Sequence, residues 1–365
     1  MRIIIIVSLS VSIGKTMLGR LKACIYGVVL FMSGCGDISH SAEWALDKQE
    51  TEQWMNTAED FSAAINRAFQ AHQVVMLGDY HWNEKVMSNY VSLLEYPGFL
   101  DKVKHLVVEF GNSRYQKELD DYLNGYSDDA SILEKVRRDA LFFTAWMPDV
   151  YVDFFMAIRR YNLSVDDDQR VRVWLAEAPF YWEEVSESSD WKTAADNKTA
   201  GFLNVAHDVM KLNEKVLMVF GAFHLLDVSN APEGVPMPLG TLLKQAYPEQ
   251  IFTVWPVTES VPNAVLSSLK ELSLLLTSQP EGKKLPFLDV LPKAKVRLSA
   301  YGYQDSSVDE LVDGLLYIGE SELSTKLPSS VMQDEEWLKE MEARLTIISG
   351  RPLSAFKKML SNSQL

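Results

Sequence analysis

The sequence is poor in cysteine, in basic residues and in long apolar runs. Its 365 residues contain two cysteines, Cys24 and Cys35, and both lie near the N-terminus. The rest of the chain therefore cannot form a disulfide, use a thiolate nucleophile or hold a metal ion through sulfur.

Basic residues are outnumbered, since 35 Lys and Arg against 50 Asp and Glu give a formal net charge of -15. Binding to nucleic acid needs basic stripes that neutralise phosphates, so we expect no nucleic-acid partner and no polyanionic substrate. The sequence also has no Gly-x-Ser-x-Gly nucleophile elbow, no Walker phosphate loop and no dinucleotide fingerprint. Hydrophobic residues still make up 47% of the chain, which is enough for a sizeable core.

No apolar run is long enough for a membrane-spanning helix, but the N-terminus has the order of an export signal. Arg20 and Lys22 precede the apolar residues 23–32, and small residues then lead to Cys35. We expect residues 1–35 to be a lipoprotein-type signal with lipidation at Cys35. Cleavage without lipidation and an uncleaved signal anchor are the alternatives.

Two details belong to this expectation. Translation can start at Met1 or at Met17, and Met17 begins the more conventional signal. A lipid at Cys35 would anchor the chain to a membrane of the bacterial cell envelope, facing the periplasm. Gly36 after the cysteine favours the outer membrane.

Helical periodicity alternates with short apolar runs in the rest of the chain. We expect strands at residues 74–78, 105–110, 171–176, 216–221, 251–255 and 314–318. Nearly continuous apolar strands separated by helices are typical of a parallel sheet that is covered on both faces. The sequence therefore predicts a three-layer α/β fold with a mainly parallel sheet.

The remaining segments are assigned around this sheet. Residues 36–56 are polar and are expected to be a weakly structured tether before a single α/β domain at 57–365. Within that domain we expect a helical insertion at about 115–161 and a helical tail at about 333–365. Residues 265–276 are expected to form a helix.

Four of the expected strands end in an ionisable side chain that can do chemistry. These side chains are Asp79 with His81, then Glu109, Glu177 and His224. In open α/β sheets, ligands bind in the crevice at the carboxyl ends of the strands. The pattern therefore predicts a pocket that contains carboxylates and two histidines.

Each of these residues also has a structural interpretation. Asp79 and His81 point to the same side of an extended segment, so the carboxylate can orient the imidazole, or both can bind a cation. A buried Glu109 needs a partner, which can be a site cation or histidine, but also Arg114 or a helix end. His224 can be a core histidine, and Glu177 can simply precede a turn of the chain.

Three further residues are candidates for substrate contacts. Arg114 and Arg138 can each clamp a carboxylate or phosphate, and Trp146 can pack against a substrate. Surface ion pairs are the equally weighted alternative for the two arginines.

The strand-end motifs resemble the superfamily that joins erythromycin esterase-like proteins, haem-binding ChaN-like lipoproteins and TraB/Tiki proteases. The shared pattern reads here as Gly78-Asp79-Tyr80-His81, Glu109 and Gly221-Ala222-Phe223-His224, with Asp79 where a Glu is usual. The segment 107–116, Val-Val-Glu-Phe-Gly-Asn-Ser-Arg-Tyr-Gln, is similar to an uncharacterised bacterial branch of that superfamily. The resemblance covers roughly residues 70–230 and implies the fold and the site more firmly than the reaction.

Three functions remain open. The first is a hydrolase of ester or amide bonds in small molecules or peptides, in which Glu109 and His81 activate water. Asp79 would orient His81, His224 would be a second base or acid, and Glu177 would complete the site. In a metal-assisted form, His81, Glu109 and His224 would hold Zn, Mn or Co.

The second function is a haem- or iron-binding lipoprotein of the ChaN type, with Tyr80, His81 or His224 as axial ligand. The third is a catalytically inactive relative that binds a partner through its helical tail.

Overall fold

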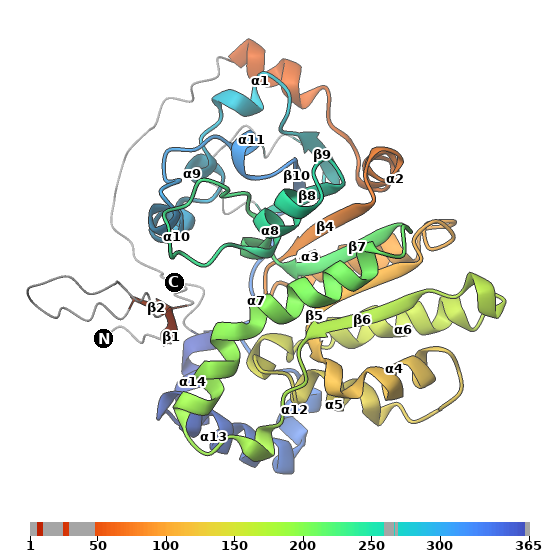
Figure 1. Cartoon of the computed structure of the whole chain (residues 1–365), viewed down its shortest axis with the longest axis vertical. Coiled ribbons are helices and arrows are strands. Elements are labelled where there is room, and N and C mark those ends of the chain that lie inside the picture. Colours follow the sequence, from red (N-terminus) through yellow and green to blue (C-terminus); the bar gives the residue numbers. More distant parts are fainter. Residues whose placement is uncertain (1–5, 10–24, 29–47, 259–265, 267–268, 362–365) are drawn as a thin grey trace, which may run out of the picture.

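The computed structural model describes residues 6–9, 25–28, 48–258, 266 and 269–361. Its centre is an eight-stranded sheet with the strand order β3-β9-β10-β8-β4-β7-β5-β6 (Figure 1). The strands are β3 (Glu59–Asp60), β4 (Val74–Asp79), β5 (His105–Asn112), β6 (Arg172–Glu177), β7 (Val216–Gly221), β8 (Ile251–Thr258), β9 (Ser273–Leu276) and β10 (Gly314–Gly319).

The pairings from β10 to β6 are parallel, whereas β9 pairs antiparallel with β10 and with β3. The six strands expected from the sequence are all present, and the mainly parallel sheet is confirmed. A separate antiparallel pair joins β1 (Ile6–Leu9) and β2 (Ile25–Val28).

Helices cover both faces of the sheet because alternate residues of each strand point to opposite sides. On β4, Val75 and Leu77 pack into one apolar cluster, while Val74 and Met76 pack into another. The first cluster includes residues of α2 (Phe61–Ala71), α3 (Glu84–Leu94), α4 (Gln116–Leu123), α5 (Ser131–Arg138) and α6 (Val150–Asn162).

The opposite face is covered by two groups of helices (Figure 1). α7 (Ser188–Met210) and α8 (Leu239–Ala246) pack in the cluster that contains Val74 and Met76. A further cluster lies toward β9 and β10 and includes α9 (Phe287–Val290), α10 (Lys295–Tyr301) and α11 (Val308–Leu311). The expected three layers are therefore present.

The helical tail consists of α12 (Ser329–Gln333), α13 (Glu335–Ser349) and α14 (Leu353–Ser361). Trp337 of α13 and Phe356 of α14 pack in one apolar cluster with Trp82 and Trp182, which follow β4 and β6. The buried Arg344 fixes α13 further, because its guanidinium donates to the Arg138 carbonyl and pairs with Asp139 at 2.8 Å. The tail thus packs beside the carboxyl ends of the strands.

Two segments differ from the sequence expectation. Residues Lys48–Met55 form helix α1, and the Trp54 side chain is buried with its indole N–H donating to the Leu276 carbonyl. The ordered fold therefore begins before residue 57, and residues 36–47 lie outside the described residues. The helix expected at 265–276 is also wrong in its second half, because Ser273–Leu276 pairs as strand β9 with neighbours on both sides.

The expected signal at 1–35 falls largely outside the described residues, as do Met17 and Cys35. Within the described ranges, no helix combines the length and apolar character needed to cross a bilayer. Lipidation at Cys35 stays a prediction.

Candidate active site

The strand order brings the predicted site residues together. β4, β7, β5 and β6 are consecutive neighbours in the sheet, and all four run parallel. Their carboxyl ends therefore meet at one edge, where Asp79 ends β4, Glu177 ends β6 and His224 follows β7. This adjacency brings four separate strand ends together at the edge of the sheet where ligands bind in open α/β folds.

Asp79 and His81 form a carboxylate–imidazole pair. The buried Asp79 accepts from Nδ1 of His81 at 2.9 Å and from the Tyr151 hydroxyl at 2.7 Å, both at Oδ2. Trp82, the next residue, has a φ of 70°, a conformation that is strained for a bulky side chain and recurs at functional sites. The Trp146 ring packs edge-on against the imidazole, with the two centroids 4.5 Å apart. His81 is thus held in one orientation, with Nε2 left free for chemistry.

Glu109 is the centre of the second group. It lies where the register of β5 against β6 shifts between Val108 and Asn112, and such irregularities redirect side chains near active sites. Its Oε2 accepts the Gly221 N–H at 2.6 Å, and its Oε1 lies 3.2 Å from Nε2 of His224. Glu109 and His224 therefore form a second carboxylate–imidazole pair.

Gly221 separates the two pairs. A Cβ atom at this position would lie 3.1 Å from Oε2 of Glu109 and 3.1 Å from both Cε1 and Nε2 of His81. The free edge of the His81 ring and the Glu109 carboxylate thus both pack closely against the Gly221 backbone. The absence of a side chain at Gly221 allows this close approach of the two functional groups.

Lys198 is a site residue that the sequence analysis missed. It projects from α7, and its ammonium lies 3.7 Å from Oε1 of Glu109 and 4.4 Å from the centre of the Phe142 ring. A lysine in the middle of a long helix follows no motif, so only the packing of α7 against β6 identifies it.

The pKa values of the two histidines are shifted in opposite directions. Burial disfavours the imidazolium of His81, but the Asp79 hydrogen bond and the charges of Asp79 and Glu109 outweigh it, so the pKa of His81 is raised. Burial lowers the pKa of His224, and Lys198 adds to this effect, although the Glu109 charge opposes it. Environments that push two pKa values apart assign acid and base roles.

The carboxylate between them stays ionised. Burial alone would raise the pKa of Glu109, but the charges of His224, Lys198 and His81 hold this pKa well below its usual range. Burial likewise lowers the pKa of Lys198, an effect that the Glu109 charge counters.

Glu177 is buried at the end of β6 and accepts the Leu141 N–H at 2.7 Å. Burial raises the pKa of Glu177 to about 8, with a further contribution from the Glu109 charge. A carboxyl group that is neutral at pH 7 can donate a hydrogen bond. Glu177 therefore lies beside the site as a neutral carboxyl group, whereas Glu109 is ionised.

The three residues expected to contact a substrate have different surroundings in the structure. Trp146 contacts His81, as described. Arg114 pairs with Glu183 at 2.8 Å and stacks on Tyr181, and Arg138 pairs with Glu134 and with Asp334 of the tail. Both arginines thus have carboxylate partners within the chain, and Arg138 links the helical insertion to the C-terminal helices; their contact with a substrate stays a prediction.

The conspicuous segment at 107–116 has a structural role apart from Glu109. The buried Asn112 side chain donates to the carbonyls of Asp139 and Phe180, and Gln116 bonds to the backbone of β6 at Val173 and Leu175. Gly111 has a φ of 139°, and a Cβ there would clash with neighbouring side chains. These residues fix the local shape that presents Glu109.

The donor set does not fit a divalent metal ion. Both oxygens of Glu109 are already hydrogen-bonded, and the Lys198 ammonium lies beside Oε1, where a cation would bind. Among the described residues no group of three histidine or carboxylate side chains is placed to hold a metal. Tyr80 suits haem iron poorly as well, since burial raises its pKa and so disfavours the phenolate.

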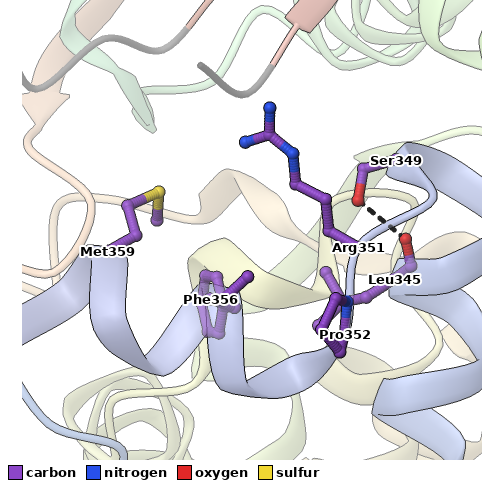
Figure 2. A pocket seen from close by; sticks show the side chains of 7 residues that line it. Leu345, Ser349, Arg351, Pro352, Phe356 and Met359 are labelled. Atoms are coloured by element: carbon purple, nitrogen blue, oxygen red, sulfur yellow. Dashed lines mark hydrogen bonds between the residues drawn. The ribbon is translucent and has the colours of Figure 1, made fainter. Parts of the chain in front are cut away.

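A hollow lies elsewhere, between α13 and α14 (Figure 2). Its lining includes Leu345, Pro352, Phe356 and Met359, with Ser349 bonded to the Leu345 carbonyl. Arg351 is its one charged side chain. It offers no carboxylate or imidazole, and none of the strand-end residues lines it.

Comparison with known proteins gives a structural likeness and no sequence match. No protein-family model matches the chain, and no curated protein is similar to it in sequence. A crystal structure of a succinoglycan biosynthesis protein aligns with a TM-score of 0.51 and 10% identity, over 76% of this chain and 98% of that one. At this identity the likeness shows the shared fold alone.

Two further solved structures align at lower TM-scores. An erythromycin esterase, EreC, in its open conformation aligns with a TM-score of 0.47 and 10% identity, over 72% of this chain and 94% of that one. Haem-binding ChaN of Campylobacter jejuni aligns with a TM-score of 0.31 and 13% identity, over 55% and 91%. These two likenesses carry no argument about function, and the chemistry below is derived from the site itself.

Replacing Glu177 by Gln tests its buried, neutral state. The folded-state pKa of about 8 lies above the ordinary 4.5, so the stabilisation is complete below pH 4.5 and is lost as the pH rises toward 8. Wild type should therefore lose stability relative to Glu177→Gln over this window, by up to about 1.4 kcal/mol per pH unit. Urea unfolding at several pH values measures this, and parallel curves for the two proteins would contradict the assignment.

Proposed function

We propose that the protein is a hydrolase of ester or amide bonds that uses two carboxylate–imidazole pairs without a metal ion. The observation that carries the proposal is the convergence of His81 and Glu109 on the Gly221 backbone, with His224 bound to the same carboxylate. Such pairs orient each imidazole, fix its tautomer and set its proton affinity.

The pKa directions assign a role to each histidine. His224 has the lowered pKa, so at neutral pH it is the base: Glu109 accepts its Nε2–H, and Nδ1 takes a proton from water. The water oxygen then attacks the carbonyl carbon of the substrate. His81 has the raised pKa, so its imidazolium donates the Nε2 proton to the departing alcohol or amine as the bond breaks. This assigns water activation to His224 with Glu109, whereas the sequence reading gave it to His81 with Glu109.

Lys198 supplies the remaining electrostatic element. Negative charge develops on the carbonyl oxygen when water adds, and a fixed cation in a largely water-excluded site stabilises that charge strongly. The ammonium of Lys198 lies within 4 Å of Glu109 and is about three-quarters buried. It is therefore the cation best placed to stabilise the oxyanion.

Replacing His224 by Ala removes the proposed base and should lower kcat/KM by at least about 10²-fold against 4-nitrophenyl esters. His207→Ala is the matched control, because His207 bonds to Tyr247 on the α7–α8 side of the fold. A folded His224→Ala variant with wild-type activity would overturn the proposal. An inactive wild type with a Soret band after haem titration would favour haem handling instead.

The pH profile tests the division of labour between the histidines. Activity requires neutral His224, whose pKa is lowered from 6.5, and protonated His81, whose pKa is raised from 6.5. The profile of kcat/KM should therefore be bell-shaped, with an acid limb below pH 6.5 and an alkaline limb above it.

In the Asp79→Asn variant the pKa of His81 should fall, because the charge that raises it is gone, and the alkaline limb should move to lower pH. The exposed Asp101→Asn should leave the profile unchanged. An unmoved alkaline limb in Asp79→Asn would contradict the role given to His81.

A further inference from the structure

Arg297 is an exposed cation that has no carboxylate partner among the residues the structure describes, in a chain of net charge -15. Among the described residues, Arg297 and Arg351 are the arginines that form no ion pair. The others each pair with an Asp or Glu, namely Arg67, Arg114, Arg137, Arg138, Arg159, Arg160, Arg170, Arg172 and Arg344. A guanidinium left unpaired among so many carboxylates is available for an external anion.

An aromatic platform holds Arg297 beside the crevice. Its Cζ lies 4.2 Å from the centre of the Phe223 ring, and Phe223 directly precedes His224. Phe223 in turn packs edge-on against the buried Trp255, with the centroids 5.4 Å apart. Stacking on a fixed ring restricts the guanidinium without using its N–H donors, so their fork remains free for a planar anion.

The charge of Arg297 reaches the reacting groups. It contributes to the lowered pKa values of His224 and Lys198, and the Glu109 charge acts on it in return. Arg297 and these site residues therefore lie within electrostatic range of one another. They do so although α10 and α7 pack in different apolar clusters.

Building on the proposed hydrolase function, we propose that the substrate carries an anionic group, a carboxylate or a phosphate, which Arg297 binds beside the scissile bond. Arginine recognises both groups through two parallel N–H···O bonds, which give direction as well as affinity. Arg297 would then act in binding and selectivity, whereas His81, Glu109, His224 and Lys198 act on the reacting atoms.

The test measures anion binding separately from catalysis. Isothermal titration of the full chain uses three probes: succinamate with one carboxylate, inorganic phosphate, and neutral succinamide. Arg297→Gln removes the charge from an exposed position and should leave the fold intact. Lys295→Gln is the matched control, because it removes a charge from an exposed side chain of α10 that faces another direction.

The expected result is that wild type and Lys295→Gln bind the anions but not succinamide, while Arg297→Gln binds them about tenfold or more weakly. Tighter binding of phosphate than of succinamate would assign a phosphoryl group, and the reverse a carboxylate. Anion binding that is unchanged in Arg297→Gln, or absent in wild type, would overturn the inference.

An activity assay separates this inference from the proposed function. 4-Nitrophenyl hydrogen succinate and 4-nitrophenyl butyrate are esters with and without the carboxylate. Arg297→Gln should raise KM for the first ester and leave the second unchanged. Arg297-dependent anion binding without hydrolysis of any ester would overturn the hydrolase proposal alone, and equal loss on both esters would overturn the anion inference alone.

Discussion

The ionised carboxylate of Glu109 is the interaction on which the site depends. A buried carboxylate is costly unless charges and hydrogen bonds compensate it, and here the Gly221 N–H, His224 and Lys198 all do so. Gly221 and His224 lie at the end of β7 and in the turn after it, while Lys198 lies on helix α7. The charge on Glu109 therefore holds the end of β7, the turn after it and helix α7 in one arrangement.

The site contains two carboxylate–imidazole pairs. Asp79 orients His81 just as Glu109 orients His224, but burial and neighbouring charges give the two imidazoles opposite pKa shifts. Two similar pairs thereby acquire different proton affinities at neutral pH. A single crevice can then offer a base and an acid, which is what the cleavage of an ester or amide requires.

The sequence predicted those features that depend only on short stretches of chain. Apolar runs ending in Asp79, Glu109, Glu177 and His224 predicted both the strands and the residues at their ends. The strand order could not be predicted from these runs, because it depends on how the helices between them cross the sheet. Without the strand order, the expectation that the four strand ends meet came only from the fold class.

The missed residues lie where no pattern distinguishes them. Lys198 is one polar residue on a helix of 23 residues, and Arg297 follows a proline-rich stretch. The motif at 107–116 contains both functional and structural residues, and sequence alone does not distinguish them. Glu109 faces the site, while Asn112 and Gln116 form hydrogen bonds to the backbone. Residues 48–55 were expected to be a tether because Trp54 and Met55 are their only apolar residues, too few to show a helical period.

Disturbing the close approach of His81 and Glu109 to Gly221 tests the proposed site most directly. The Gly221 φ of -48° and ψ of 131° suit alanine, so Gly221→Ala should fold normally, while its methyl group would lie 3.1 Å from His81 and from Glu109. The account predicts that kcat/KM against 4-nitrophenyl esters falls by about 10²-fold, with a thermal unfolding midpoint close to that of wild type. A folded Gly221→Ala protein with wild-type kcat/KM would contradict it, because the placement of His81 and Glu109 against Gly221 would then not matter to the reaction.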